Sequence, residues 1–128
     1  MNILLDTHVA LWAITDHPQL AQSAREMIFS QRNDVWVSTV TIWEIAIKHR
    51  LGRGDMPISS EQAVNYFTQA GYRFLLIKPE HAVMTETLHA HHQDPFDRLL
   101  VAQALAEPMR LITHDETVAK YSDTVILI

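Results

Sequence analysis

The sequence contains no cysteine among its 128 residues. Disulfide bonds, thiolate metal sites and a cysteine nucleophile are therefore excluded, which is typical of a reducing compartment. The longest uninterrupted apolar run, residues 9–14, is far shorter than the roughly 20 residues of a membrane-spanning helix. Asp6 also interrupts any signal-peptide pattern at the start. We therefore expect a cytoplasmic protein with no membrane partner, whose metal ligands would be oxygen and imidazole groups.

Glycine and basic residues are also scarce. The three glycines form no phosphate-binding loop and no Gly-x-Ser-x-Gly motif, which argues against a P-loop nucleotide hydrolase and a serine hydrolase. Ten basic and fifteen acidic residues give a net charge of −5, the opposite sign to that of most proteins that bind phosphates with their own surface. A simple DNA-binding module is therefore unfavoured. A metal-dependent nuclease is not, because bound divalent cations place positive charge beside a phosphate.

Short β-rich segments alternate with helical patterns along the whole chain, which has the length of one domain and no linker or repeat. Five apolar runs too short for helices predict strands at residues 3–5, 35–37, 74–77, 111–113 and 125–128. Helical periodicity predicts helices from residue 9 and at residues 20–28, 43–51, 63–70, 83–88 and 99–106. This alternation predicts an α/β fold with a mainly parallel sheet covered by helices on both faces. Ligands of such sheets bind outside the carboxyl ends of the strands.

Two carboxylates near the start of the chain each have two interpretations. Asp6 directly follows the first predicted strand, so it either caps the next helix or serves a site at the sheet edge. Glu44 lies in a helix that is apolar on almost every side. It either pairs with Lys48 one turn later on the surface or faces a polar cleft. The sequence favours the cleft for Glu44 and leaves Asp6 open.

Two later segments also carry acids beside predicted helix starts. In Asp94-Pro95-Phe96-Asp97, helix capping alone explains both acids, with Asp94 as the N-cap and Pro95 at the first helical position. The helix that follows is nearly all apolar and therefore buried, which fixes Asp97 in place and leaves Asp94 as the simpler cap. Asp115 follows a predicted strand and either caps a short helix or joins a site at the sheet edge.

The predicted topology brings these acids together at one edge of the sheet. Carboxylates at close range repel each other, and burying them unpaired is costly, so such a cluster indicates a bound cation. Oxygen ligands of this kind suit Mg²⁺ or Mn²⁺. We therefore predict catalytic and metal-binding roles for Asp6, Glu44, Asp97 and Asp115. Supporting or substrate-contacting positions are predicted for Thr7, Ser38, Asp94, Arg98, Thr113 and His114.

The histidines and the basic residues give weaker signals. His89, His91 and His92 match no zinc-binding spacing, which favours a surface cluster over a metal site. His114, next to Asp115, is interpreted either as a substrate contact or as an ordinary loop residue. Basic residues concentrate only at residues 48–53, where they form either a solvated helix end or a phosphate contact.

Four segments, in this order, resemble the motifs of PIN-domain proteins of the VapC type, the toxins of bacterial toxin-antitoxin modules. They are Ile3-Leu4-Leu5-Asp6-Thr7-His8, Ser38-Thr39-Val40-Thr41-Ile42-Trp43-Glu44-Ile45, Asp94-Pro95-Phe96-Asp97-Arg98-Leu99-Leu100 and Thr113-His114-Asp115. The resemblance spans nearly the whole chain, and its third segment is the most specific.

The resemblance implies one PIN domain over residues 1–128, with a three-layer α/β/α sandwich and about five strands. It implies a Mg²⁺- or Mn²⁺-dependent endoribonuclease that cuts a structured RNA such as tRNA or rRNA. It also implies inhibition by a cognate VapB-like antitoxin, and a homodimer or a larger hetero-oligomer with that antitoxin. DNA would then be bound only through the antitoxin, in keeping with the acidic charge of this chain.

Two other classes of function stay open at this stage. The first is a non-catalytic partner-binding domain with the same fold, in which the acids only cap helices. The second is a phosphatase or phosphotransferase that uses Asp6 as its nucleophile. The second reading lacks the usual second acid two residues later, where His8 stands.

Overall fold

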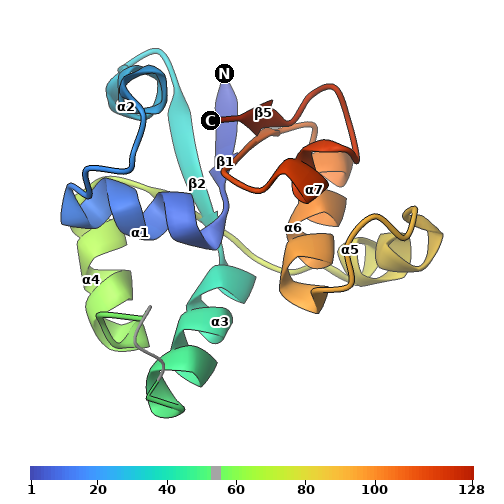
Figure 1. The fold of residues 1–128 in the computed structure, drawn as a ribbon, viewed down its shortest axis with the longest axis horizontal. Coiled ribbons are helices and arrows are strands. Elements are labelled where there is room, and N and C mark those ends of the chain that lie inside the picture. Colours follow the sequence, from blue (N-terminus) through green and yellow to red (C-terminus); the bar gives the residue numbers. More distant parts are fainter. Residues whose placement is uncertain (53–55) are drawn as a thin grey trace.

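The computed structural model describes residues 1–52 and 56–128. Within them, five parallel strands form one sheet in the order β3-β2-β1-β4-β5. The strands are β1 (Asn2–Leu5), β2 (Asp34–Ser38), β3 (Arg73–Leu75), β4 (Arg110–Thr113) and β5 (Ile126–Leu127). The predicted parallel sheet is therefore confirmed, with β1 at its centre (Figure 1).

Helices connect successive strands, as the sequence pattern predicts. They are α1 (Thr7–Thr15), α2 (Gln22–Phe29), α3 (Thr39–Arg50), α4 (Ser60–Gln69), α5 (Pro79–Met84), α6 (Pro95–Ala106) and α7 (Glu116–Ala119), with one 3₁₀ turn, η1 (Thr85–Thr87). Helix α4 ends before Gly71, whose φ of 80° is a left-handed conformation that glycine adopts without strain. Among the described residues, no helix is both long and apolar enough to cross a membrane.

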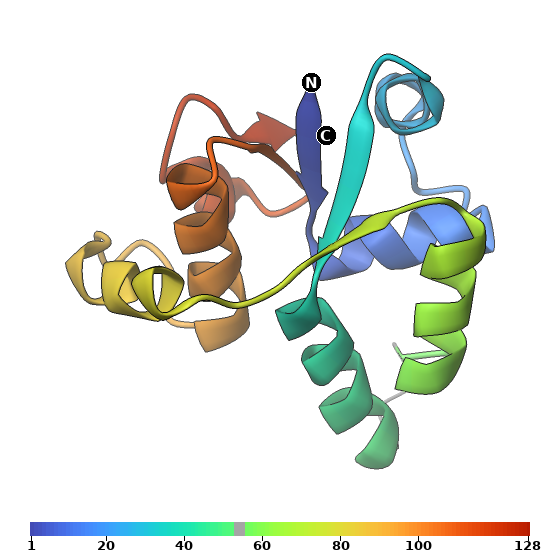
Figure 2. The same cartoon turned by 180° about the vertical axis from the view of Figure 1, so that it is seen from behind.

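Both faces of β1 are buried, so the sheet lies between two helical layers. Ile3 and Leu5 pack in one apolar cluster with Phe67 of α4, while Leu4 packs in a second cluster with Leu100 of α6. Helices α1, α2 and α4 lie on one side of the strands, and α5, α6 and α7 lie on the other (Figures 1 and 2). This arrangement is the predicted three-layer α/β/α sandwich.

The strand order places a topological switch point beside β1. The chain runs outward from β1 through β2 to β3, and then crosses back through α5 and α6 to place β4 on the other side of β1. The carboxyl ends of β1 and β4 therefore flank the crevice where ligands of open parallel sheets bind. Asp6 follows β1 directly, and Thr113 is the last residue of β4.

Several predicted elements have different bounds in the structure, and helices α3, α4 and α6 each begin three or four residues earlier than predicted. Strand β3 stops at Leu75, which pairs with Ser38 at the end of β2, so Leu76 and Ile77 have no strand beside them and are exposed. Strand β5 is shortened to two residues. The helix predicted at residues 83–88 begins earlier, at Pro79, and tightens into η1 after Met84.

Candidate active site

Asp6 lies at the carboxyl end of the central strand, where it caps the next helix and also contacts the end of β4. One carboxylate oxygen accepts a 2.9 Å hydrogen bond from the backbone N–H of Val9 and so caps α1. The other accepts a hydrogen bond from the hydroxyl of Thr113. The side chain is buried, and this burial raises its pKa despite the hydrogen bonds, which act in the opposite direction.

Glu44 faces inward from the second turn of α3, with only 4% of its surface exposed. One carboxylate oxygen accepts a 2.6 Å hydrogen bond from the hydroxyl of Thr7, and the other lies 2.7 Å from the ammonium nitrogen of Lys48. The i,i+4 pair therefore exists, but it is not a surface pair, because Glu44 is buried and faces a polar cavity, as the favoured interpretation predicts. Lys48 turns toward the acids, whereas His49 and Arg50 are exposed at the helix end. Arg53, the last residue of the predicted basic patch, lies outside the described residues.

Asp94 and Asp97 share the start of α6 but have different surroundings. Asp94 is the N-cap and accepts hydrogen bonds from the backbone N–H groups of Phe96 and Asp97 at 2.8 and 3.3 Å. The pKa of Asp97 is raised to about 7, first by burial and then by the negative charges of Asp94, Asp6 and Glu44. The structure thus brings Asp97 into an electrostatic cluster with Asp6 and Glu44, as the sequence predicts.

Asp115 joins the cluster from the far side of the switch point. It caps α7 by accepting a 2.8 Å hydrogen bond from the backbone N–H of Thr117. Its second oxygen lies 3.0 Å from Nε2 of His92, which is also 3.2 Å from a carboxylate oxygen of Asp97. Although burial acts to raise the pKa of Asp115, the hydrogen bonds from Thr117 and His92 outweigh it and lower the pKa.

His92 is a site residue that the sequence interpretation missed. The prediction of a surface cluster is correct for His89 and His91, which are exposed, but wrong for His92, whose ring bridges Asp97 and Asp115. Nδ1 of His92 accepts a 3.0 Å hydrogen bond from the backbone N–H of Asp94, so the ring proton is on Nε2. In this geometry Nε2 of His92 donates to the acids, and the ligand atoms of His92, Asp97 and Asp115 all lie within 4.8 Å of one another, close enough to hold a cation. The available sequence signal was its position two residues before a capping aspartate.

The acidic side chains line one small cavity of about 220 Å³, here called the acidic cavity. Its lining residues are Asp6, Thr7, His8, Glu44, Lys48, His92, Asp94, Asp97 and Asp115. These carboxylates repel one another, since Asp94, Asp6 and Glu44 contribute to the raised pKa of Asp97. A divalent cation would relieve that repulsion. Hard oxygen donors of this kind fit Mg²⁺ or Mn²⁺, so the residues present fit the metal that the sequence predicts.

Three other predicted site residues act around the cavity rather than in it. Ser38 is buried and caps α3 by accepting a 3.0 Å hydrogen bond from the backbone N–H of Val40. Thr113 links two of the acids, since its hydroxyl donates to Asp6 and accepts from the backbone N–H of Asp115. His114 is exposed and packs edge-on against Trp12, with ring centroids 5.0 Å apart.

Arg98 does not enter the acidic cavity. Its guanidinium donates hydrogen bonds to the backbone carbonyls of Thr85 and His89 at 2.7 and 2.9 Å and to the hydroxyl of Tyr121 at 3.0 Å. Tyr121 in turn accepts a 2.9 Å hydrogen bond from the backbone N–H of His92. Arg98 therefore holds the segment that positions His92, which fits the supporting role of the two that the sequence leaves open for it.

We expect Arg98→Met to lower the free energy of unfolding by about 2 kcal/mol, because several carbonyls lose a charged donor. Amide hydrogen exchange at residues 85–92 should accelerate more than exchange in the sheet. Arg50→Met is the matched control, since Arg50 is exposed at the end of α3. Equal stability of the Arg98 and Arg50 variants would contradict the structural role of Arg98.

Asp94 offers a second prediction, because asparagine caps helices as well as aspartate does. We expect Asp94→Asn to keep the melting temperature of the protein, and Asp94→Ala to lower the free energy of unfolding by about 1 kcal/mol. If Asp94 is mainly a cap, Asp94→Asn also keeps most of the cation-dependent nuclease activity proposed below. An Asp94→Asn protein as inactive as an Asp6→Asn protein would place Asp94 among the cation-binding groups.

Comparison with known proteins identifies the family. The profile of the PIN domain family matches residues 3–123. The chain therefore belongs to the PIN domain family, and the family resemblance seen in the sequence is confirmed. PIN domains are generally nucleases that act on nucleic acids. A search of curated proteins by sequence finds no match.

Solved structures share the fold at low sequence identity. A chain in the crystal structure of VapBC2 from Rickettsia felis, bound to a DNA fragment from its promoter, is 16% identical, with a TM-score of 0.72 and coverage of 100% of this chain and 98% of that one. DNA-bound VapBC from Salmonella typhimurium gives 14% identity, a TM-score of 0.70 and coverage of 100% and 97%. The structure of the PIN domain endonuclease Utp24 is 12% identical, with a TM-score of 0.54 and coverage of 94% of this chain and 75% of that one.

Proposed function

We propose that this chain, as one PIN domain over residues 1–128, is a Mg²⁺- or Mn²⁺-dependent endoribonuclease of the VapC type. The observation that carries the proposal is the group of acids at the topological switch point, in which Asp6 and Glu44 are buried and Asp97 is half-buried. Burial, and then the negative charges of Asp94, Asp6 and Glu44, raise the pKa of Asp97 to about 7, and such clustered carboxylates are a feature of functional sites.

In this proposal Asp6, Glu44 and Asp97 hold the cation, and Asp115 either helps to place a second cation or orients the attacking water. A bound divalent cation supplies polarisation of the scissile phosphate and lowers the pKa of the water that attacks it. Thr7 and Thr113 fix the carboxylates of Glu44 and Asp6 by donating hydrogen bonds to them.

Inhibition by a VapB-like antitoxin is the second part of the proposal. It is supported by the likeness of the fold to chains in VapBC complexes, two of which contain DNA. The net charge of −5 makes this chain a poor DNA-binding surface by itself. We therefore assign DNA binding to the antitoxin, within a homodimer or a larger hetero-oligomer.

Incubation of the antitoxin-free protein with labelled total RNA tests the activity. We expect discrete fragments in Mg²⁺ or Mn²⁺ and none in EDTA, and the mapped ends would identify the RNA that is cut. Intact RNA in every cation, together with a melting temperature that cations do not change, would favour the non-catalytic partner-binding domain instead.

A further inference from the structure

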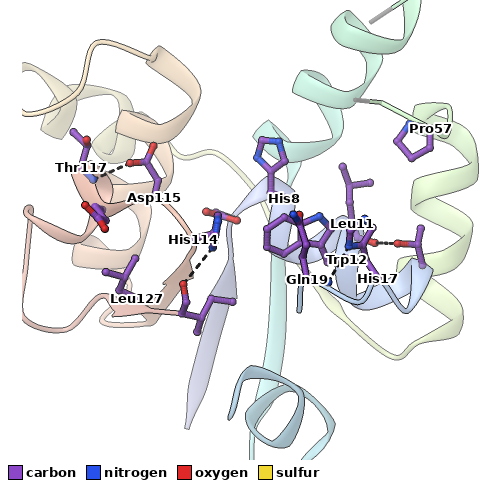
Figure 3. Close-up of a pocket in the computed structure, with 14 residues that line it drawn as sticks. His8, Leu11, Trp12, His17, Gln19, Pro57, His114, Asp115, Thr117 and Leu127 are labelled. Atoms are coloured by element: carbon purple, nitrogen blue, oxygen red, sulfur yellow. Dashed lines mark hydrogen bonds between the residues drawn. The ribbon is translucent and has the colours of Figure 1, made fainter. Parts of the chain in front are cut away.

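A larger open groove adjoins the acidic cavity. It encloses about 1100 Å³ and shares Asp6, His8 and Asp115 with the acidic cavity, so the two are adjacent. Figure 3 shows its walls, formed on one side by α1 with His8, Leu11 and Trp12, and on the other by the segment after β4. We call it the ring groove, after the rings of His8, Trp12, His17 and His114 that line it.

Aromatic and imidazole rings are concentrated in this groove. The Trp12 indole contacts three imidazoles, with centroid distances of 5.0 Å to His114, 5.7 Å to His17 and 6.2 Å to His8. His8 and His114 are exposed, whereas Trp12 is half-buried against the apolar core. Packing against the core therefore holds Trp12 in place, and the exposed rings of His8 and His114 contact it.

The Trp12 indole also keeps an unused hydrogen-bond donor. No described residue accepts a hydrogen bond from its N–H, whereas the indole N–H of Trp36 donates to the side-chain oxygen of Asn2 at 3.1 Å. Indole N–H groups that are not paired within a protein remain available to solvent or to a ligand. The groove thus offers ring surfaces, among them an indole with an unpaired donor, beside the acidic cavity.

From this combination we infer that the ring groove binds the base of an unpaired nucleotide next to the scissile phosphate. Bases stack on aromatic and histidine rings, and each stacked base contributes binding without a strict sequence requirement. A base inside a helix is already stacked on both faces, so only a single-stranded or extruded nucleotide fits. The inference rests on the proposed nuclease function, because the acidic cavity fixes where the neighbouring phosphate lies.

Nuclear magnetic resonance of the Mg²⁺-loaded full chain tests this inference without a known RNA target. The probes are adenosine 5′-monophosphate and ribose 5-phosphate, which carry the same phosphate with and without a base. We expect adenosine 5′-monophosphate to shift the indole N–H signal of Trp12 and ribose 5-phosphate to leave it unchanged. Trp12→Phe assigns that signal among the three tryptophans.

The variant His8→Ala/His114→Ala should weaken binding of adenosine 5′-monophosphate about fivefold or more, as expected for loss of a stacking surface. The matched control is His89→Ala/His91→Ala, which removes another exposed imidazole pair, with centroids 5.6 Å apart, outside the groove. The control should bind the nucleotide as tightly as the unchanged protein.

Three results overturn base stacking: equal shifts with both probes, no shift at Trp12, or equal weakening by the two double variants. The absence of a shift is also the result expected if the groove takes a protein segment instead. If the protein cleaves RNA but adenosine 5′-monophosphate does not shift the Trp12 signal, base stacking is wrong and the nuclease function stands. A shifted Trp12 signal with RNA intact in every cation would support the groove and contradict the nuclease.

Discussion

Asp6→Asn is expected to abolish cation-dependent RNA cleavage while leaving the fold intact. Asparagine keeps an oxygen that accepts from the backbone N–H of Val9 and an amide that contacts the Thr113 hydroxyl. It lacks the negative charge that a divalent cation requires. Because changes to groups that merely support metal ligands cost 10- to 100-fold in many proteins, we expect a loss of about a hundredfold or more.

Measuring the cleavage rate of a labelled RNA in Mg²⁺ and Mn²⁺ checks this expectation, with the melting temperature measured in parallel. Asp123→Asn is the matched control, since Asp123 is an exposed aspartate that does not line the acidic cavity and the change removes the same single charge. It should cleave at the unchanged rate. Cleavage by Asp6→Asn at that same rate would remove Asp6 from the site and attribute the activity to a contaminant or to other residues.

The second large effect is expected at Asp97, whose pKa is raised from 3.8 to about 7 by burial and by neighbouring acids. An acid with a raised pKa binds more protons in the folded than in the unfolded state across this window. The metal-free protein should therefore lose stability as the pH rises from 3.8 to about 7. The neighbouring carboxylates titrate together with Asp97, so this dependence belongs to the cluster.

Asp97→Asn should raise the melting temperature of the metal-free protein at pH 7.5 by about 3 °C or more, since it removes one repelling charge. Mg²⁺ or Mn²⁺ should stabilise the unchanged protein more at pH 7.5 than at pH 5.5, because protons compete with the cation. The variant should lose that stabilisation.

Thermal unfolding in EDTA and in each cation, at both pH values, measures these effects. Asp123→Asn again serves as the control for removal of one negative charge. A lower melting temperature for metal-free Asp97→Asn, or full stabilisation of that variant by cations, would mean that Asp97 has a structural and not a cation-binding function.

Most of the fold followed from local patterns. Apolar runs of strand length, such as residues 3–5 and 111–113, predicted a sheet buried on both faces, and the helical periods between them predicted parallel crossovers. The pattern at Asp94-Pro95 predicted the N-cap of α6, and the structure has it there. Patterns of this kind depend only on residues that are close together in the chain, so a single sequence is sufficient to predict them.

The site was only partly predictable, because its remaining features depend on which elements lie side by side. His92 was assigned to the surface from its spacing, yet its ring bridges Asp97 and Asp115 because Arg98 and Tyr121 hold its segment against α6 and α7. The sequence left open whether Arg98 supports the site or contacts substrate. Its use as an internal support appears only when Thr85 and His89 are placed beside it.

The sequence by itself determined the elements, the order of the strands along the chain and the four acids that follow or begin elements. Periodicity, capping chemistry and motif spacing are local properties, so they can be recognised from neighbouring residues alone. Only the tertiary structure decided that Glu44 is buried against Thr7, that His92 donates to the acids, and that His114 turns toward Trp12. These features depend on packing between segments far apart in the chain, where burial and charge set each side chain's surroundings.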